Sequence, residues 1–272
     1  MELKRLPQII GSLDEESSSR CVELFSRTTP TVIKVSSLEA AEIIKLIDNS
    51  YRDTSFAFAN EVALISRKLG LDGNEVIQAA NFGYSRNNIP KPGFVGGICL
   101  EKDPYILNDS AGFECGLILS ARKINESLPA LVLDSINRYV QNNKKDFNGI
   151  KVFISGFAFK GEPETDDLRG SPTIGLISLI KEANIKNIFG HDFIVSNENI
   201  KSLGVEPCSI EEGFKDADVV ILMNNHKNYG DVDMENLVNT TNMGALIFDG
   251  WQIAANLKEN QHIKYESLGY IS

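Results

Sequence analysis

The chain has 272 residues, 42% of them hydrophobic and 24% charged, which is typical of a soluble globular protein with room for two domains. Its formal net charge of −10 argues against nucleic acid or an anionic membrane as a partner but allows a local basic pocket for a phosphorylated ligand. It has no apolar run long enough to span a membrane and no signal-peptide core. The four cysteines lie far apart and without metal-ligand spacing, so we expect reduced thiols in a cytoplasmic protein and no metal site: Cys21, Cys99, Cys115 and Cys208.

The N-terminal stretch predicts two short strands separated by a helix. Residues 6–11 form an apolar run that ends at a glycine, and residues 31–35 alternate between apolar and polar side chains. Between them, acidic residues at 14–16 mark the first turn of a helix that reaches about residue 26.

The longest regular stretch, residues 36–69, contains no proline or glycine. A serine at its start can cap a helix, and apolar side chains recur at threes and fours, which predicts one long amphipathic helix. A helix of this length in a small domain packs against several elements or against a partner subunit. Lys45 and Asn49 lie four residues apart on one face, and on spacing alone Lys45 reads as a solvated lysine.

Residues 91–103 are the most unusual part of the chain, because Gly93, Gly96 and Gly97 fall within five positions. A backbone without Cβ atoms can approach a ligand closely, so this segment is a candidate binding loop.

Cys99 follows these glycines and is the candidate nucleophile. Asp103 and Pro104 predict the start of a helix over residues 104–108, because aspartate caps helices and proline is tolerated in the first turn. A thiol just ahead of a helix N-terminus is favoured as the thiolate, which suits nucleophilic chemistry. The alternative is a glycine-rich turn that carries a buried, inert cysteine.

Two further helices are predicted on either side of this segment, over residues 74–80 and 117–142. Asn125, in the second, reads only as a polar side chain on the surface. The polar, turn-rich residues 142–149 then mark a boundary. We therefore predict two domains, residues 1–146 and residues 147–272.

The second half alternates apolar strands with helices, which predicts a doubly wound parallel sheet covered on both faces. The strands are expected at residues 150–157, 185–190, 218–223 and 245–249, and the helices at 171–183 and 210–214.

The loop after the first of these strands lies where such sheets bind ligands, outside the carboxyl ends of the strands. It holds Lys160, Asp166, Asp167 and Arg169, and the helix that begins at residues 171–172 can meet a phosphate. The alternative is a polar surface loop with internal salt bridges. Since no GxGxxG occurs, the domain is not a recognisable dinucleotide site.

Three motifs, taken together and in order, resemble the UDP-glucose/GDP-mannose dehydrogenase family, the nucleotide-sugar 6-dehydrogenases. Residues 92–104 (Pro-Gly-Phe-Val-Gly-Gly-Ile-Cys-Leu-Glu-Lys-Asp-Pro) are similar to its catalytic-cysteine signature. Residues 39–49, continued by Asn60 and Glu61, are similar to its central-helix motif. Residues 156–160 and 166–172 are similar to the signature of its C-terminal nucleotide-binding domain, so the resemblance covers nearly the whole chain.

The resemblance implies oxidation of a primary alcohol at sugar C6 to a carboxylate, with reduction of two NAD⁺. Cys99 would attack the aldehyde and give a thiohemiacetal and then a thioester, while Lys45 stabilises the oxyanion and Asn49 orients a sugar oxygen or a water. Asp103 would assist proton transfer and thioester hydrolysis. Further residues would contact the substrate: Phe94, Gly96, Gly97, Lys160, Arg169 and Arg86. Arg86 would reach the substrate of its own subunit or of the neighbouring one.

The resemblance also implies an α/β fold, in which a mainly helical central domain with one long helix precedes a Rossmann-like doubly wound parallel sheet, and a homodimer through the long helix. Family members begin with an NAD-binding Rossmann domain, and this sequence is expected to start just after it. UDP-glucose, UDP-N-acetylhexosamine and GDP-mannose are compatible substrates, and we favour a UDP-sugar.

Two other functions are weighed beside this dehydrogenase. One is a non-catalytic nucleotide-sugar-binding or dimerisation module that lacks the cofactor domain. The other is an unrelated cysteine hydrolase, which would need a histidine base; all three histidines lie in the second half with no hydrolase-like context.

Overall fold

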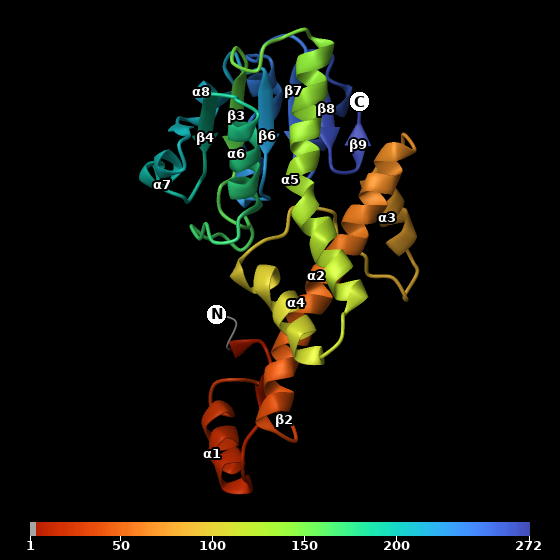
Figure 1. Ribbon diagram of the computed structural model, residues 1–272, viewed down its shortest axis with the longest axis vertical. Coiled ribbons are helices and arrows are strands. Elements are labelled where there is room, and N and C mark those ends of the chain that lie inside the picture. Colours follow the sequence, from red (N-terminus) through yellow and green to blue (C-terminus); the bar gives the residue numbers. More distant parts are fainter. Residues whose placement is uncertain (1–3) are drawn as a thin grey trace.

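The computed structural model describes residues 4–272, and its two ends carry different kinds of structure (Figure 1). At one end β1 (Gln8–Ile10) and β2 (Val32–Lys34) pair in parallel, connected by α1 (Glu15–Phe25). The Asp14 carboxylate caps α1 by accepting the Ser17 N–H. The sequence patterns predicted all three elements correctly, and a larger sheet occupies the other end.

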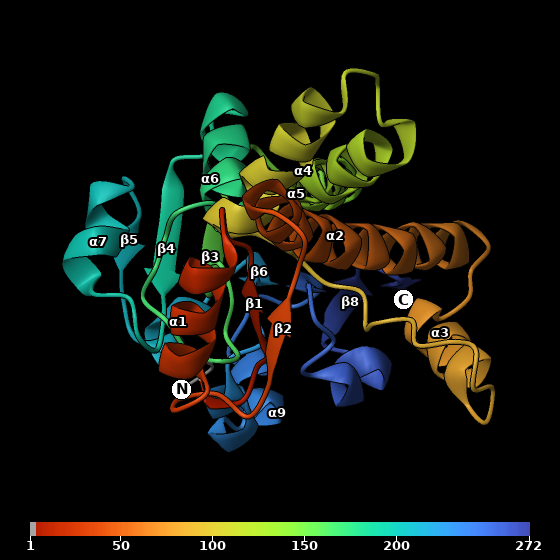
Figure 2. The same cartoon turned by 90° about the horizontal axis from the view of Figure 1, so that it is seen from below.

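The long helix α2 (Leu38–Lys68) is capped by Ser37, one of the two serines, Ser36 and Ser37, that could cap it, and it packs on α4 and α5 (Figure 2). Small buried residues, Ala57, Ala59 and Ala63, allow close contact with its neighbours. One apolar stripe of the helix instead faces outward, with side chains 41–74% exposed: Ile43, Ile47, Tyr51, Phe58 and Ile65. The helix prediction is therefore confirmed, while part of its apolar surface is left uncovered by the described residues.

Three further helices complete the central part: α3 (Gly73–Asn81), α4 (Ile98–Ala111) and α5 (Gly116–Asn142). The predicted helix start at Asp103 and Pro104 is wrong, because α4 begins at Ile98 and contains Pro104 in its interior. A proline has no N–H to donate to the carbonyl four residues earlier, here that of Leu100. The Arg122 guanidinium donates to this carbonyl instead, at 3.0 Å, so the helix continues through the proline.

The C-terminal part is a seven-stranded sheet in the order β5-β4-β3-β6-β7-β8-β9, parallel except for β9. Its strands are β3 (Lys151–Ser155), β4 (Asn187–His191), β5 (Glu206–Pro207), β6 (Val219–Leu222), β7 (Ala245–Asp249), β8 (Ile263–Ser267) and β9 (Tyr270–Ile271). Its helices are α6 (Pro172–Glu182), α7 (Asn197–Ser202), α8 (Ile210–Phe214) and α9 (Met234–Val238), with short 3₁₀ turns η2 (Lys227–Asp231) and η3 (Ala255–Glu259).

Two hydrophobic clusters cover the two faces of this sheet, which confirms the doubly wound α/β fold. α6 and the C-terminal half of α5 pack on one face (Figure 1). α8 and α9 pack on the other. α5 thus packs against the central helices and also against the C-terminal sheet. The division at residues 146 and 147 remains a prediction.

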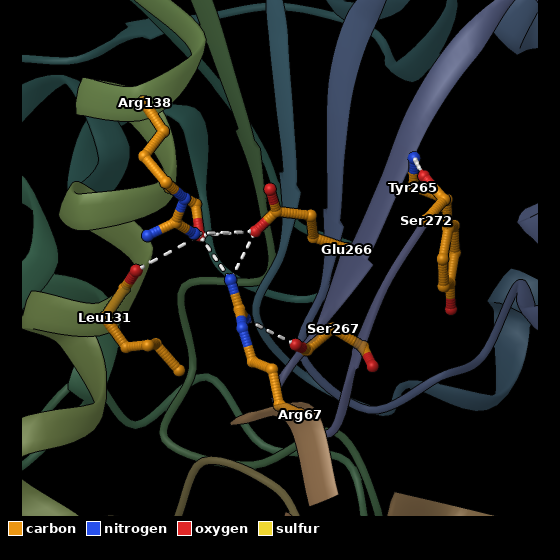
Figure 3. A network of polar contacts seen from close by, with 8 residues as sticks. Arg67, Leu131, Arg138, Tyr265, Glu266, Ser267 and Ser272 are labelled. Carbon is orange, nitrogen blue, oxygen red and sulfur yellow. Dashed lines mark hydrogen bonds and ion pairs between the residues drawn. The ribbon is translucent and has the colours of Figure 1, made fainter. Parts of the chain in front are cut away.

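A buried ion pair attaches the end of α2 to the sheet (Figure 3). Arg67 pairs with the Glu266 carboxylate on β8 and donates to the Ser267 carbonyl at 2.7 Å. Glu266 also accepts from Ser135 at 2.7 Å and from Arg138 at 3.0 Å, both on α5. Burial lowers the pKa of the Arg67 guanidinium. The network fixes α2 and α5 relative to the sheet. Across residues 4–272, no helix combines the length and apolarity needed to cross a membrane.

Candidate active site

A cavity of about 530 Å³ lies where α2, residues 93–100 (the glycine segment) and the loop after β3 meet. Residues from five parts of the chain line it: Lys45, Asn49, Arg52 and Phe56 from α2; Phe94–Leu100; Phe159, Lys160, Glu162, Asp167 and Arg169 from the loop after β3; Asn225 after β6; and Trp251 after β7. Most of the residues that the family motifs singled out are therefore gathered at one place.

The α2 wall of the cavity is a single helical stripe. Lys45, Asn49, Arg52 and Phe56 follow one another at intervals of four, three and four residues, which places them on one face of a helix. This face is opposite to the exposed apolar stripe. Arg52 and Phe56 were missed by the sequence analysis, although continuing the spacing from Lys45 and Asn49 would have found both.

Cys99 is exposed, lines the cavity and lies in the first turn of α4, rather than ahead of the helix as predicted. Asp103 does not line the cavity. Its buried carboxylate accepts hydrogen bonds from the Asn49 amide and, at 2.8 Å, from the Lys102 ammonium. The hydrogen bond to Asp103 raises the pKa of the Lys102 ammonium. The buried Asp103 carboxylate, which does not line the cavity, therefore positions the Asn49 side chain, which does.

The glycine segment touches the loop after β3 directly. The Gly97 N–H donates to the Gly170 carbonyl at 2.8 Å, and a Cβ at Gly96 would lie 2.1 Å from the same oxygen. Only glycine fits such an approach. Phe94 lines the cavity mainly through its backbone, because its ring is 3% exposed and packs against Phe248 in the core of the sheet.

Lys160 and Arg169 bring positive charge to the opposite wall. The Lys160 ammonium lies 5.2 Å from the centre of the Phe159 ring. Arg169 is exposed and forms a two-point ion pair with Asp167, at 2.9 and 2.8 Å. These bonds lower the pKa of the Asp167 carboxyl to about 2. With Lys45 and Arg52, two walls of the cavity present cations, which suits an anionic ligand.

Trp251 closes the cavity and has no sequence signal, since it comes from the distant loop after β7. Its Nε1 donates to the Met223 carbonyl at 3.2 Å, and its ring packs on Gly93, where a Cβ would lie 2.5 Å away. The Phe56 ring meets it edge-on, at 6.4 Å between centroids. Such a fixed aromatic ring can stack on a planar base.

Two predicted contacts lie outside this cavity. Arg86 is exposed on the segment after α3 and is not among the lining residues. The N-terminus of α6, expected to meet a phosphate, faces a smaller cavity of about 270 Å³ that Glu101, Glu126 and Arg122 also line, the last already paired with Asp53. Carboxylates at that position would repel a phosphate.

The C-terminal sheet does not fit a dinucleotide in the usual Rossmann position between β3 and β6. A Cβ at Gly156 would lie 2.7 to 2.9 Å from Asn224, so no ligand space is left there. The N–H groups of Phe157 and Ala158 already donate to the Asp192 carboxylate, at 2.6 and 3.2 Å. In residues 4–272 we find no group of acidic, histidine or cysteine side chains arranged to hold a metal ion.

Comparisons with known proteins agree with this geometry. Residues 39–127 match the central domain of the UDP-glucose/GDP-mannose dehydrogenase family, and residues 153–256 match the UDP binding domain of the same family.

The chain is 31% identical to UDP-N-acetyl-D-mannosamine dehydrogenase of Methanocaldococcus jannaschii over 88% of this chain and 52% of that protein. It is 32% identical to NDP-N-acetyl-D-galactosaminuronic acid dehydrogenase of Ralstonia nicotianae, over 87% of this chain and 54% of that protein. The solved structure of UDP-D-ManNAc dehydrogenase from Pyrococcus horikoshii superposes with a TM-score of 0.85 at 28% identity. That superposition covers 98% of this chain and 61% of the other.

The chain therefore spans about half the length of the curated relatives it matches. Both family matches fall on the elements that build the cavity: α2, the glycine segment and the loop after β3. The motifs, the fold and the matches agree that the chain belongs to the UDP-glucose/GDP-mannose dehydrogenase family.

Proposed function

We propose that this chain is the nucleotide-sugar-binding, thiol-bearing part of an NAD-dependent dehydrogenase that oxidises C6 of a UDP-sugar, either UDP-glucose or a UDP-N-acetylhexosamine. The observation that carries the proposal is the convergence of Cys99, Lys45 and Asn49 with cations and aromatic rings around one cavity. Cations suit a diphosphate, and a fixed aromatic ring suits a nucleobase.

In this proposal Lys160 and Arg169 bind the diphosphate, and Trp251 stacks on the base. The Cys99 sulfur adds to the aldehyde carbon at C6, and the carbonyl electron pair moves to oxygen as an alkoxide, which Lys45 stabilises. Asn49, held by Asp103, orients the sugar. The C-terminal sheet itself does not fit NAD.

The test is calorimetric titration of the chain with UDP-glucose, UDP-N-acetylglucosamine, UDP-N-acetylmannosamine, GDP-mannose and NAD⁺. We expect one UDP-sugar to bind, and Lys160→Ala to weaken its binding about tenfold or more by removing a charge-assisted contact. Lys186→Ala, which removes an exposed lysine far from the cavity, is the matched control. Absence of UDP-sugar binding, or equal affinity in both variants, would contradict the proposed binding mode.

A non-catalytic nucleotide-sugar-binding module is the second candidate. It is favoured by the lack of fit of the C-terminal sheet to a dinucleotide. The two candidates differ at Cys99. A catalytic part should form a covalent adduct with a C6 aldehyde of the bound UDP-sugar, detectable by mass spectrometry and absent in Cys99→Ser. A binding module should bind the sugar without forming that adduct.

We also propose a homodimer through α2, supported by its exposed apolar stripe. Scattered apolar residues on a surface are ordinary, but Ile47, Tyr51, Phe58 and Ile65 continue along one helix face. Light scattering should give the mass of a dimer, and Phe58→Glu should shift it toward the monomer. A monomeric wild type would contradict this assembly. In such a dimer Arg86 remains a candidate substrate contact.

A further inference from the structure

The first residue of the glycine segment, Gly93, is held by the Asn60 side chain, which bonds to both its backbone N–H and its carbonyl, as a paired β-strand would. The Asn60 amide oxygen accepts the Gly93 N–H at 2.9 Å, and the Asn60 amide nitrogen donates to the Gly93 carbonyl at 3.1 Å. Both backbone groups of Gly93 are thus satisfied by one residue of α2. No other side chain in the described chain hydrogen-bonds to them.

The last residue of the segment is fixed by a different helix. The Leu100 carbonyl would normally accept the N–H of residue 104, but Pro104 has none to donate. The Arg122 guanidinium from α5 takes that place, at 3.0 Å. Cys99 lies directly before this second attachment point. A proline within α4 therefore creates the free carbonyl that Arg122 uses to hold the end of the segment.

The two attachment points are joined by an unbroken polar chain. The Asn60 amide donates to the Asn125 amide oxygen at 2.9 Å, and Asn125 donates to the Asp53 carboxylate at 2.9 Å. The same carboxylate oxygen of Asp53 accepts from Arg122 at 2.7 Å. All four side chains are 0–3% exposed, and none of them lines the main cavity.

Stability alone does not explain this arrangement. A buried ion pair between helices often stabilises a protein no better than apolar side chains of the same volume. Burial raises the pKa of the Asp53 carboxyl despite the attraction of Arg122. In addition, Asp53 Oδ2 has no hydrogen-bond partner among the described residues, and Arg122 Nε has only a 3.3 Å ion-pair contact with the half-exposed Glu126 carboxylate. Apart from the bonds among these four side chains, their hydrogen bonds go to the Asp53 carbonyl and to the backbone of Gly93 and Leu100.

We infer that Asp53, Asn60, Arg122 and Asn125 are positioning residues that fix residues 93–100, and with them Cys99 and the glycine amides, against the α2 wall of the cavity. The role of Cys99 as a nucleophile rests on the proposed function. The geometry and its test do not, because neither uses a ligand.

The test compares Asn60→Ala with Val220→Ala, a core truncation on the far face of the sheet that serves as the control for general destabilisation. Asn60→Ala should speed amide hydrogen exchange across residues 94–99 about tenfold or more, since both bonds to Gly93 are lost. It should also change the pH profile of Cys99 alkylation by iodoacetamide, measured by mass spectrometry with Cys21 as internal reference. Val220→Ala should change neither.

Asp53 offers a conservative variant that tests the chain itself. Asp53→Asn keeps an oxygen that can accept from Arg122 and Asn125, so it should preserve the wild-type Cys99 profile far better than Asp53→Ala. If Asn60→Ala fails to fold, Asn125→Ala provides the same comparison, because it removes the hydrogen bonds that connect Asn60 to Asp53. Exchange and alkylation profiles that match those of Val220→Ala would overturn the inference. Failure of UDP-sugar binding would leave this result unaffected.

Discussion

Replacing Glu266 by glutamine should strongly destabilise the fold. The carboxylate is 11% exposed, pairs with the 6% exposed Arg67, and also accepts from Ser135 and Arg138. Glu266→Gln keeps the shape but leaves the buried Arg67 charge without a counter-charge, a change that costs about 3–5 kcal/mol. The Arg138 pair adds little, because that side chain is 44% exposed and solvent screens it.

Urea unfolding followed by circular dichroism measures this cost. A loss of 3–5 kcal/mol should lower the unfolding midpoint by about 1–2 M urea. The matched control is Glu15→Gln, which removes the same charge from the exposed Lys34 pair and should cost under about 1 kcal/mol. The double variant Arg67→Met with Glu266→Leu should recover most of the stability. A Glu266→Gln cost equal to that of Glu15→Gln would refute the reasoning.

Three further predictions concern the cavity walls and a distant thiol. Gly96→Ala places a Cβ 2.1 Å from the Gly170 carbonyl oxygen, so it should lower the free energy of unfolding by about 1–3 kcal/mol in urea titration and abolish UDP-sugar binding; wild-type values for both would contradict the close contact. Burial raises the pKa of Cys208 to about 11, so its alkylation rate should keep rising up to that pH; a plateau below pH 9.5 would contradict this. The pKa of Asp167 is lowered to about 2, so its ion pair with Arg169 should persist above that pH and be lost as the pH falls through it; an NMR titration midpoint near the usual value of 3.8 would contradict the pairing.

Local sequence signals were enough to place most elements. Asp14 and Ser37 cap the helices that were expected to begin there, and four apolar runs became strands β3, β4, β6 and β7. Strands β5 and β9 have two residues each, too few for a pattern to show. The local sequence around Pro104 predicts a helix start, which is wrong. Pro104 lies inside α4, where the Arg122 guanidinium bonds to the carbonyl that the proline leaves free.

The candidate site was predictable where it lies on one motif and not where distant segments meet. Lys45, Asn49 and Cys99 line the cavity, as the resemblance implied. Trp251 was not foreseen, because nothing local shows that the loop after β7 reaches Gly93. The sequence predicts a surface position for Asn125, which is wrong. A single polar side chain on a helix gives no sign that it will be buried and hydrogen-bonded to Asp53.

The central claim is that one cavity holds both the Cys99 thiol and the nucleotide sugar, and a protection experiment tests it most directly. The chain is alkylated with iodoacetamide, with and without saturating UDP-sugar, and labelling of Cys99 and Cys21 is followed by mass spectrometry. We predict that one UDP-sugar slows Cys99 labelling about tenfold or more, as expected when a ligand covers most of its site, and leaves Cys21 unchanged. Cys99 labelling at the same rate with every UDP-sugar would contradict the account.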